Sequence, residues 1–585
     1  MFLSKNYNKI TGKTRLSILH SYRDINGNVK KKVMLNIGDL NTVHDRFPDI
    51  IGDPIEYFEN LAKQMTFDYK ENTETTIKLN FNELLNSDIQ YSYNFGSLIP
   101  SSVFHELELH ELFTHRNKYT NISAFLPNKV IQLLVYNRIL EPASKLGVYN
   151  TKNKYFDIEA DKNHIIELQH IYRTLDFLAP LKSDVISWLN NKIHALYPRD
   201  TSIILYDVTN YYFESDSITD LRNKGFSKEN KKTPIIQMGL AIDRNGIPIT
   251  YELFSGNTHD CKTFDDILSN LKKEYNNDSK IIIVADKGLN SGDNIAESII
   301  KGNGYIFGQS IKKLPENELK RVFNGKYNHF YDKNGKLTHS MRSEIVSKVI
   351  QVSTTHQKSK KKVEIEQKQI TYYSVKYANM QKKKREAKIN KAYQIIANPS
   401  LYDKQCDQGA YGYVLNAEID SETGEIKPQK NKKLVLDIKK IKEEQKCDGY
   451  YMIVTSELKM NENEIIKAYH DLWKIEDTFK ITKSDLELRP FNHRTDERVR
   501  GHFLMCYISL VILRILHHKL ENEYSCAKII SELNQIKATY VKENIYQLSH
   551  RSEVTDKFDD VFETNFKNKW ITKSDINKNF SKLRK

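Results

Sequence analysis

The chain has 585 residues, of which 39% are hydrophobic, and its length predicts three or four domains with several hydrophobic cores. The formal net charge of +14 favours an acidic partner, most often nucleic acid, although the abundance of Lys, Asn, Ile and Tyr is also typical of an AT-rich genome. The five dispersed cysteines exclude a disulfide framework and a zinc site, and the N-terminus lacks an apolar signal segment. We therefore expect a soluble cytoplasmic protein.

The first 200 residues predict two modules of different character. Residues 1–95 form a β-rich N-terminal module, because strand-like alternation at 14–23 and 33–38 flanks an Asn26–Gly27 turn signal. Residues 96–200 form a helical module, with the clearest apolar periodicity at 130–135 and 184–189. This helical module is either a DNA-binding module or a plain scaffold.

Residues 201–310 alternate between short strands and helices. An apolar run at 203–209 carries Asp207 at its end, and a second run at 281–285 is followed by Asp286. Strands at 235–243, 249–254 and 305–308 and helices at 264–273 and 291–301 complete this part. The predicted order is β(Asp)-β-β-α-β(Asp)-α-β, an α/β core.

A polar, basic block interrupts this core at residues 311–448. It mixes strand-like stretches with a charged helix at 379–396, and residues 358–388 contain eleven Lys and Arg against three Glu. We interpret the block as a β-rich insertion domain. Its positive charge fits either a solvated helix or a groove that binds nucleic acid. The second interpretation is favoured by interleaved tyrosines that would supply faces for stacking, namely Tyr372, Tyr373, Tyr377 and Tyr393.

Residues 449–517 return to the core with a strand at 450–455 and a helix that Asn461 or Asn463 would cap. Tyr469, Glu476 and Lys483 recur every seven residues and would share one helix face, with Trp473 and Lys480 beside them. An ordinary surface helix with Glu–Lys pairs is the structural alternative.

The apolar helix at 497–516 is too short to span a bilayer and contains Arg514, so we expect it to be buried. Residues 518–585 are predicted to be a helical C-terminal region.

Three acids stand out as a possible metal site. A single Asp after a strand is commonly a turn or cap residue, but Asp207, Asp286 and Glu476 together give an all-oxygen donor set that suits Mg²⁺, or Mn²⁺ in its place. Two such ions roughly 4 Å apart assist phosphoryl displacement. Thr209 could bond a phosphate, and the lysines and Trp473 could hold DNA beside the acids.

These motifs resemble DDE transposases of bacterial insertion sequences. The strings LYDVT around Asp207, SGNTHD at 255–260, ADKG around Asp286 and WKIE ending at Glu476 are similar to the insertion-sequence-four superfamily, in its long branch with an N-terminal region. Its signature of Tyr, Arg, Glu and Lys is matched at Tyr469, Glu476 and Lys483. The Arg position is Leu472 in this chain, so Lys474 or Lys480 would have to supply the missing contact.

The resemblance implies a ribonuclease H-like catalytic core (201–310 and 449–517). It also implies a DNA transposase that binds its element's ends, cleaves them with two Mg²⁺ held by Asp207, Asp286 and Glu476, and joins the 3′-OH ends to target DNA. Tyr469, Lys483 and Arg489 would contact DNA. A homodimer would pair the two ends, without a membrane or nucleotide cofactor. Two alternatives are an inactive relative that only binds DNA and a nuclease that hydrolyses without joining.

Several secondary candidates follow from the same resemblance. His493, Arg498 and His502 match family positions, but Arg498 and His502 could equally pack on the core. Asn257 and His259 lie in a loop near the acids and are explained as well by turn chemistry. Many family members form a DNA hairpin with a base stacked on an aromatic residue of the insertion. This insertion has no Trp, so a Tyr would have to serve, and a hairpin step is not part of the prediction.

Overall fold

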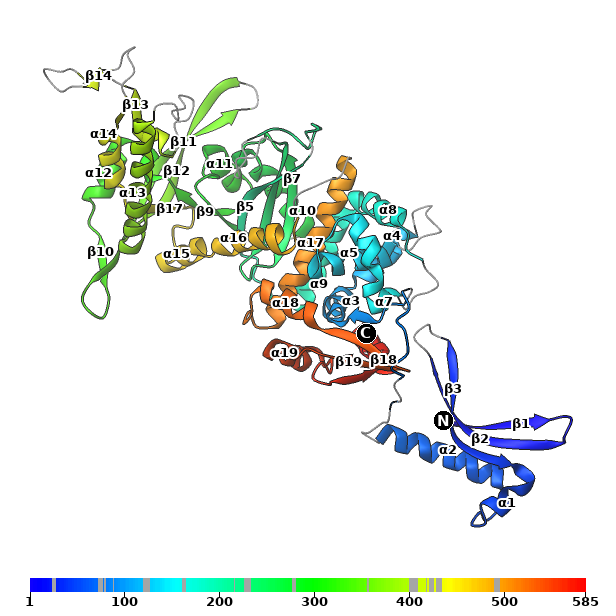
Figure 1. Ribbon diagram of the computed structural model, residues 1–585. Helices are drawn as coiled ribbons and strands as arrows, with labels where there is room; N and C mark the ends of the chain where they lie inside the picture. The colour runs from blue at the N-terminus through cyan, green and yellow to red at the C-terminus, as the bar shows by residue number, and fades with distance from the viewer. Residues whose placement is uncertain are drawn as a thin grey trace. The chain divides into compact units, whose positions relative to one another are not determined.

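The computed structural model, drawn as a ribbon in Figure 1, divides into two compact units. The first contains Met1–Lys192, Ile481–Leu488 and His493–Lys585, and the second contains Ile193–Lys480 and Arg489–Asn492. The structure describes all residues except 24–27, 72–76, 78–79, 88, 119–126, 160–164, 215, 226–232, 276–279, 355–356, 399–408, 417, 420–425, 428–433, 489–494 and 585.

The first unit begins with a three-stranded antiparallel sheet in the order β1-β2-β3, built from β1 (Phe2–Asn8), β2 (Lys13–Arg23) and β3 (Val29–Asp39). The short helix α1 (Val43–Arg46) and the longer α2 (Pro54–Glu71) follow it. Apolar side chains of the sheet and of α2 form a small separate core. This confirms strands on both sides of the expected Asn26–Gly27 turn, which itself lies outside the described residues.

Helices make up the next part of the first unit, as predicted for residues 96–200. The long helix α17 (Asp496–Lys519) packs against α3, α5 and α8, and its most apolar window is 94% buried inside the protein. A helix this apolar could cross a membrane by length and composition, but here it is a core helix. The other helices are α3 (Leu98–Glu106), α4 (Leu109–Asn117), α5 (Pro127–Leu140), α6 (Lys145–Thr151), α7 (Phe156–Glu159), α8 (Leu168–Leu178) and α9 (Lys182–Leu196), of which the last belongs to the first unit only as far as Lys192.

The C-terminal region is not wholly helical, so that prediction was wrong in part. A four-stranded sheet in the order β20-β19-β18-β4 includes three strands from this region. Its edge strand β4 (Ser92–Asn94) pairs with β18 but comes from far earlier in the chain. Such non-local pairing leaves little trace in a local apolar pattern. The remaining elements are α18 (Cys526–Gln535), β18 (Lys537–Lys542), β19 (Ile545–Leu548), α19 (Glu553–Phe562), β20 (Trp570–Thr572) and α20 (Lys573–Lys582).

The second unit is built on a nine-stranded sheet in the order β10-β11-β12-β17-β9-β8-β5-β6-β7. Strands β5, β8 and β9 are parallel, whereas β6 and β7 pair antiparallel beside β5, so a β-β-β-α-β-α-β segment gives the strand order of a ribonuclease H-like core. The strands are β5 (Ile203–Tyr212), β6 (Ile235–Asp243), β7 (Pro248–Ser255), β8 (Ile282–Ala285), β9 (Gly304–Gln309) and β17 (Tyr450–Thr455), with helices α10 (Phe264–Tyr275) and α11 (Gly292–Ile300).

The strands of the insertion extend this same sheet, as Figure 1 shows. The long hairpin β11 (Leu337–Thr354) and β12 (Gln357–Ser374) is joined to the core because β12 pairs with β17. Buried residues of α13 (Val375–Ala397) form a second, small core with β13 and neighbouring residues. The other elements are α12 (Glu316–Asn324), β10 (Asn328–Tyr331), β13 (Val414–Asn416), β14 (Glu418–Ile419), β15 (Ile426–Lys427), β16 (Leu434–Leu436) and α14 (Ile438–Lys446).

The segment that carries Glu476 is not one continuous helix. Helix α15 (Glu462–His470), capped by Asn461 as predicted, ends before a turn, and α16 (Trp473–Lys480) begins after it. In that turn the amides of Leu472 and Lys474 bond to carbonyls three residues earlier, at 3.2 and 2.9 Å. A π-helical turn (Ile481–Asp485) follows α16. The predicted single stripe from Tyr469 to Lys483 is therefore wrong, since a seven-residue repeat shares a face only on an uninterrupted helix.

Candidate active site

Asp207 and Asp286 lie at the same level of two neighbouring parallel strands. Tyr206 of β5 pairs with Ala285 of β8; Asp207 is the next residue of β5, and Asp286 is the residue that follows β8. Asp207 is not at the end of β5, as predicted, because β5 continues to Tyr212 by pairing with β6. It lies instead where the pairing with β8 stops. Neighbouring strands are about 4.8 Å apart, so the register brings the two acids close together.

A tyrosine from α15 bonds directly to the second acid. The Tyr469 hydroxyl donates a hydrogen bond to Asp286 Oδ1 at 3.2 Å. Burial first, and then the negative charge of Asp286, raise the pKa of Tyr469 above its ordinary value, which keeps the phenol protonated as a donor. Gly308 at the end of β9 makes room for this contact, because a Cβ built there would lie 2.3 Å from the Tyr469 hydroxyl oxygen.

Glu476 completes the set from α16, which packs against β5 and β6. Its negative charge also contributes to the raised pKa of Tyr469, so Glu476 lies within electrostatic reach of the Tyr469–Asp286 pair. All three acids line one cavity of 590 Å³. The three predicted acids therefore share one cavity, and Tyr469 and Trp473 line the same cavity.

The three acids line this cavity, but their side chains are not arranged as the ligands of one metal ion. Within the described part of the chain, no three carboxylate, His or Cys side chains are grouped closely enough to hold a metal ion. Asp207 Oδ1 accepts a hydrogen bond from the amide of Val208 at 2.7 Å. The chemistry of the donors nevertheless fits Mg²⁺ or Mn²⁺, because all three side chains offer only oxygen.

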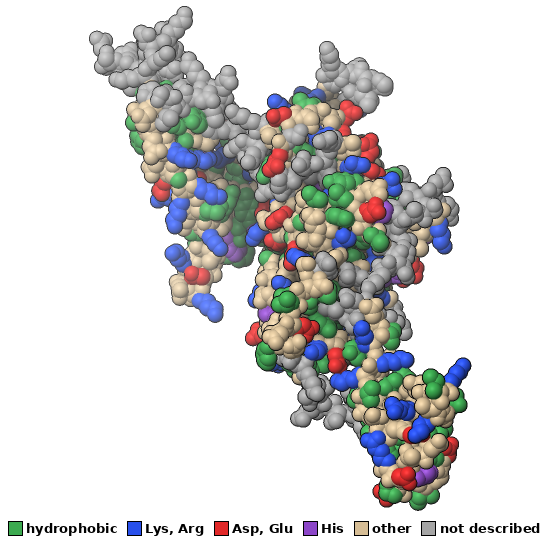
Figure 2. Space-filling model, turned by 45° about the vertical axis from the view of Figure 1, so that its right-hand side comes forward, with side chains coloured by type: hydrophobic (Ala, Val, Ile, Leu, Met, Phe, Trp, Pro, Cys, Tyr) green, Lys and Arg blue, Asp and Glu red, His purple; other side chains and the backbone are tan. Residues whose placement is uncertain are grey.

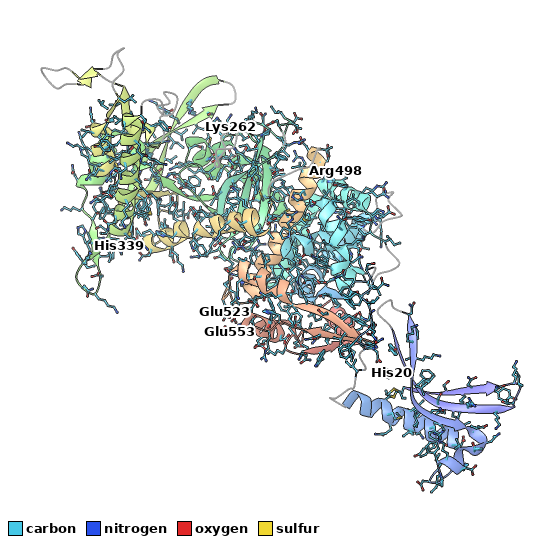
Figure 3. All side chains as sticks on the ribbon, viewed as in Figure 1. His20, Lys262, His339, Arg498, Glu523 and Glu553 are labelled. Carbon is cyan, nitrogen blue, oxygen red and sulfur yellow. The ribbon has the colours of Figure 1, made fainter. Side chains whose placement is uncertain are left out.

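Stacked aromatic rings from the insertion lead to the same cavity. The ring centroids of Phe330 and His339 are 4.5 Å apart, with 7° between the ring planes. Those of His339 and Tyr372 are 5.1 Å apart, with 10° between the planes. The ring centroids of Tyr372 and Tyr451 are 4.9 Å apart, and both tyrosines line the cavity. His339, labelled in Figure 3, is in the middle of this column, and burial lowers its pKa, which favours a neutral ring. The column offers flat faces for stacking.

The other predicted DNA-binding residues are placed less clearly at the cavity. Lys480 is exposed on α16 and Thr209 is buried in β5, and neither lines the cavity. Lys483 belongs to the first unit, whereas the acids belong to the second. Arg489 lies outside the described residues, as does His493.

The position that departs from the family signature is apolar and enclosed. Leu472 is 9% exposed and lines the cavity at the turn between α15 and α16. Lys474 is a poor substitute for the family's arginine because it already bonds to the carbonyl of Arg244 at 2.8 Å and pairs with Asp471 at 3.1 Å.

Two secondary candidates on α17 have packing roles. Arg498, labelled in Figure 3, pairs with Asp176 at 2.9 Å and lies over the ring of Tyr172. His502 is buried, with its ring nitrogens 3.3 Å from Lys145 Nζ and 3.6 Å from Cys506 Sγ. These contacts favour the interpretation that both residues pack on the core of the first unit.

Sequence reasoning missed several residues of the cavity. Lys287 follows Asp286 directly and lines the cavity with an exposed side chain, and Lys312 lines it while pairing with Glu444 at 2.7 Å. The Tyr451 hydroxyl lies 3.1 Å from His470 Nε2. A pair of tyrosines opening the strand at 450–455 was the available signal, since most residues of a buried strand are aliphatic.

Comparisons with known proteins agree with this geometry. Residues 198–512, more than half of the chain, match the model of the transposase DDE domain. The chain belongs to this family. Residues 3–76 match the N-terminal domain of IS1634 family transposases, so the protein is a DNA transposase of the insertion-sequence type, as its motifs indicated. The transposase is thus an enzyme that cuts and transfers DNA strands.

Other comparisons add little to the fold. Among solved structures, the transposase is similar to one described as "Mos1 transposase paired-end complex with left transposon end", at 11% identity over 46% of this chain and 72% of that chain. The TM-score is 0.14, so the ribonuclease H-like assignment here rests on the strand order and the family match. Comparison with curated proteins gave no match.

Proposed function

We propose that Asp207, Asp286 and Glu476 are the catalytic residues of this transposase. The observation that carries the proposal is that acids from β5, from the end of β8 and from α16 line one cavity in a ribonuclease H-like core. They would hold two Mg²⁺, with Mn²⁺ as a substitute, and these ions would stabilise the negative charge that develops on the phosphate oxygens during strand cleavage and joining.

The other residues of the cavity would bind and orient the DNA. Lys287, whose side chain is exposed, supplies positive charge for phosphates. Tyr372, Tyr451 and Trp473 offer ring faces for unpaired bases, and Trp473 is suited to this because it is 59% exposed. Tyr469 fixes the orientation of Asp286 through its hydrogen bond.

The substrate would be the pair of terminal inverted repeats of the transposase's own element, followed by target DNA. Two ends must be held together for excision and insertion, so the working form would be a homodimer with two ends, acting in the cytoplasm on nucleoid DNA. No P-loop or glycine-rich nucleotide motif occurs in the sequence, so a nucleotide cofactor is not expected.

Cleavage of a labelled duplex that carries the inverted repeat bracketing the gene tests the catalytic assignment. We expect nicking in Mg²⁺ by the wild type and a loss on the order of 10³-fold in Asp207→Asn and Glu476→Gln, because the stabilisation of charge is worth several kcal/mol. Glu464→Gln is the matched control, since Glu464 is exposed on α15 and does not line the cavity. Equal cleavage by all variants would reject the assignment.

The same substrate separates the two alternatives. An inactive relative would bind the end tightly and leave it intact in Mg²⁺. A nuclease would cut it but would not join a pre-cleaved end with a free 3′-OH to a second duplex. A joined product that is lost in Glu476→Gln would support the transposase proposal against both.

A further inference from the structure

The N-terminal sheet has one covered face and one open face. Helix α2 covers the first, where Leu16, Ile18 and Phe58 are fully buried. Lys5 lies on the same side and pairs with Glu59 of α2 at 2.8 Å. Because side chains alternate along a strand, the residues between these positions lie on the opposite face of the sheet.

The strand register gives the composition of the open face. Ser4 pairs with Ser17 and Ser17 with Asn36, so one row of small polar side chains crosses all three strands. On one side of this row, Arg15 lies between Asn6 and Asp39, and Asp39 pairs with Lys13 at 3.5 Å. On the other side, the pairs Phe2↔Leu19, Leu19↔Val33 and Ser21↔Lys31 add apolar side chains, a hydroxyl and a second basic group. The side chains of Asn6, Arg15 and Asn36 are exposed, and Val33 is 59% exposed.

Charge is divided between the two sides of this module. The three strands carry seven Lys and Arg against one Asp, whereas α2 carries two Lys against four Asp and Glu. Basic side chains are visible on the N-terminal module in Figure 2. Lysines on an edge strand also protect it from pairing with other chains, and this explains Lys30 to Lys32 on β3. It does not explain Arg15, which lies on the open face of the central strand.

We propose that the open face of the N-terminal sheet, centred on Arg15, Ser17 and Asn36, binds the major groove of duplex DNA and reads its sequence. Neighbouring strands are about 4.8 Å apart, and the major groove is about 12 Å wide and admits a two-stranded β-ribbon, so β2 and β3, which carry Arg15, Ser17 and Asn36, fit within it. The proposal deepens the proposed function, because it assigns recognition of the element's ends to this face.

Each kind of side chain on the open face suits one kind of contact. An arginine bonds to guanine O6 and N7, and an asparagine bonds to adenine N6 and N7. Exposed Val33 suits the methyl group of thymine, and Lys31 at the end of the face suits a phosphate. The Lys31 ammonium group lies 5.6 Å from the centroid of the Phe2 ring, and the side chain of Lys31 is exposed.

Selection from a duplex library with a randomised centre, using the full-length protein in EDTA, would give the preferred sequence. Fluorescence anisotropy on that duplex then measures the variants. We expect Arg15→Ala and Asn36→Ala to lose roughly 5- to 100-fold in affinity for this sequence and to relax preference at a few base pairs. Lys31→Ala should weaken binding to all sequences alike and reduce the salt slope by about one.

Lys63→Ala is the matched control, since Lys63 is an exposed lysine on α2 of the same module. It should bind like the wild type, and all variants should keep the wild-type melting temperature. Replacing guanine by 7-deazaguanine removes a major-groove acceptor and should reproduce the loss seen in Arg15→Ala.

Wild-type affinity and sequence preference in Arg15→Ala and Asn36→Ala would overturn the proposal, as would indifference to 7-deazaguanine. Binding in EDTA does not depend on cleavage, so it separates this proposal from the catalytic one. Asp207→Asn should bind the selected duplex normally while failing to cut an end, whereas Arg15→Ala should remain able to join a pre-cleaved end at high DNA concentration.

Discussion

The contact between Tyr469 and Asp286 shows how single residues prepare this site. A carboxylate that accepts a hydrogen bond from a protonated phenol has one favoured orientation, and the raised pKa of Tyr469 maintains the proton. Gly308 is part of the same arrangement, because any larger residue would occupy the space of the Tyr469 hydroxyl. Orientation of a reacting group contributes to rate even when the group that orients it takes no part in the chemistry.

Tyr469→Phe should lower end cleavage by roughly 10- to 100-fold, since a hydrogen bond to a charged group is worth roughly 1.5–3 kcal/mol. The exposed Tyr393 of α13 provides the control, and Tyr393→Phe should cleave like the wild type.

Gly308→Ala should lower the rate of end cleavage as much as Tyr469→Phe does. The same Gly308→Ala change should lower the rate much less when Tyr469 is already Phe, because the clashing oxygen is then gone. Cleavage rates of the two single variants and the double variant check this, and strictly additive losses would contradict it.

At the level of elements, local patterns predicted most of the second unit well. Apolar runs of four to nine residues gave the strands, because strands buried on both faces are hydrophobic along their whole length. The break at Asp471 and Leu472 was missed because its residues are compatible with a helix and only the tertiary fold interrupts it. No local pattern indicated that β12 would pair with β17 and so continue the core sheet, since that pairing joins distant segments.

A lysine of α6, which packs against α8 and α5, is buried in the core of the first unit. Lys145 on α6 is 5% exposed and lies 3.3 Å from His502 of α17. Burial, and next the charge of Arg138, lower the pKa of Lys145 from 10.5 to about 7. Above pH 7 the folded protein therefore holds a neutral amine where the unfolded chain still binds a proton.

The free energy of unfolding should therefore rise with pH between about 7 and 10 by up to about 1.4 kcal/mol per unit from this residue. In this window the unfolded state binds more protons than the native state, which is the condition for stability to increase with pH. Lys145→Met should remove that increase, whereas Lys63→Met at the surface should keep it. Urea unfolding at several pH values measures the slope, and equal slopes in all three proteins would contradict the account.

For the whole molecule, the site depends on segments that are far apart in the sequence. Asp207 and Asp286 come from parallel strands of one sheet, whereas Glu476 reaches the cavity only after the chain has passed through the insertion. The residue types and the resemblance predicted all three acids. Their common cavity, and the contribution of the insertion's tyrosines to its wall, could be seen only in the folded chain.

The central claim is that these three carboxylates hold the metal ions used in DNA cleavage, and a change of ligand at Asp286 tests it most directly. A thiolate binds soft metal ions better than Mg²⁺. Asp286→Cys should therefore fail to cleave a labelled end in Mg²⁺ and should recover activity when Mn²⁺ or Cd²⁺ is supplied, while Asp286→Ala should recover with neither. Full activity of Asp286→Cys in Mg²⁺, or equal behaviour of the Cys and Ala variants with every metal, would contradict the assignment.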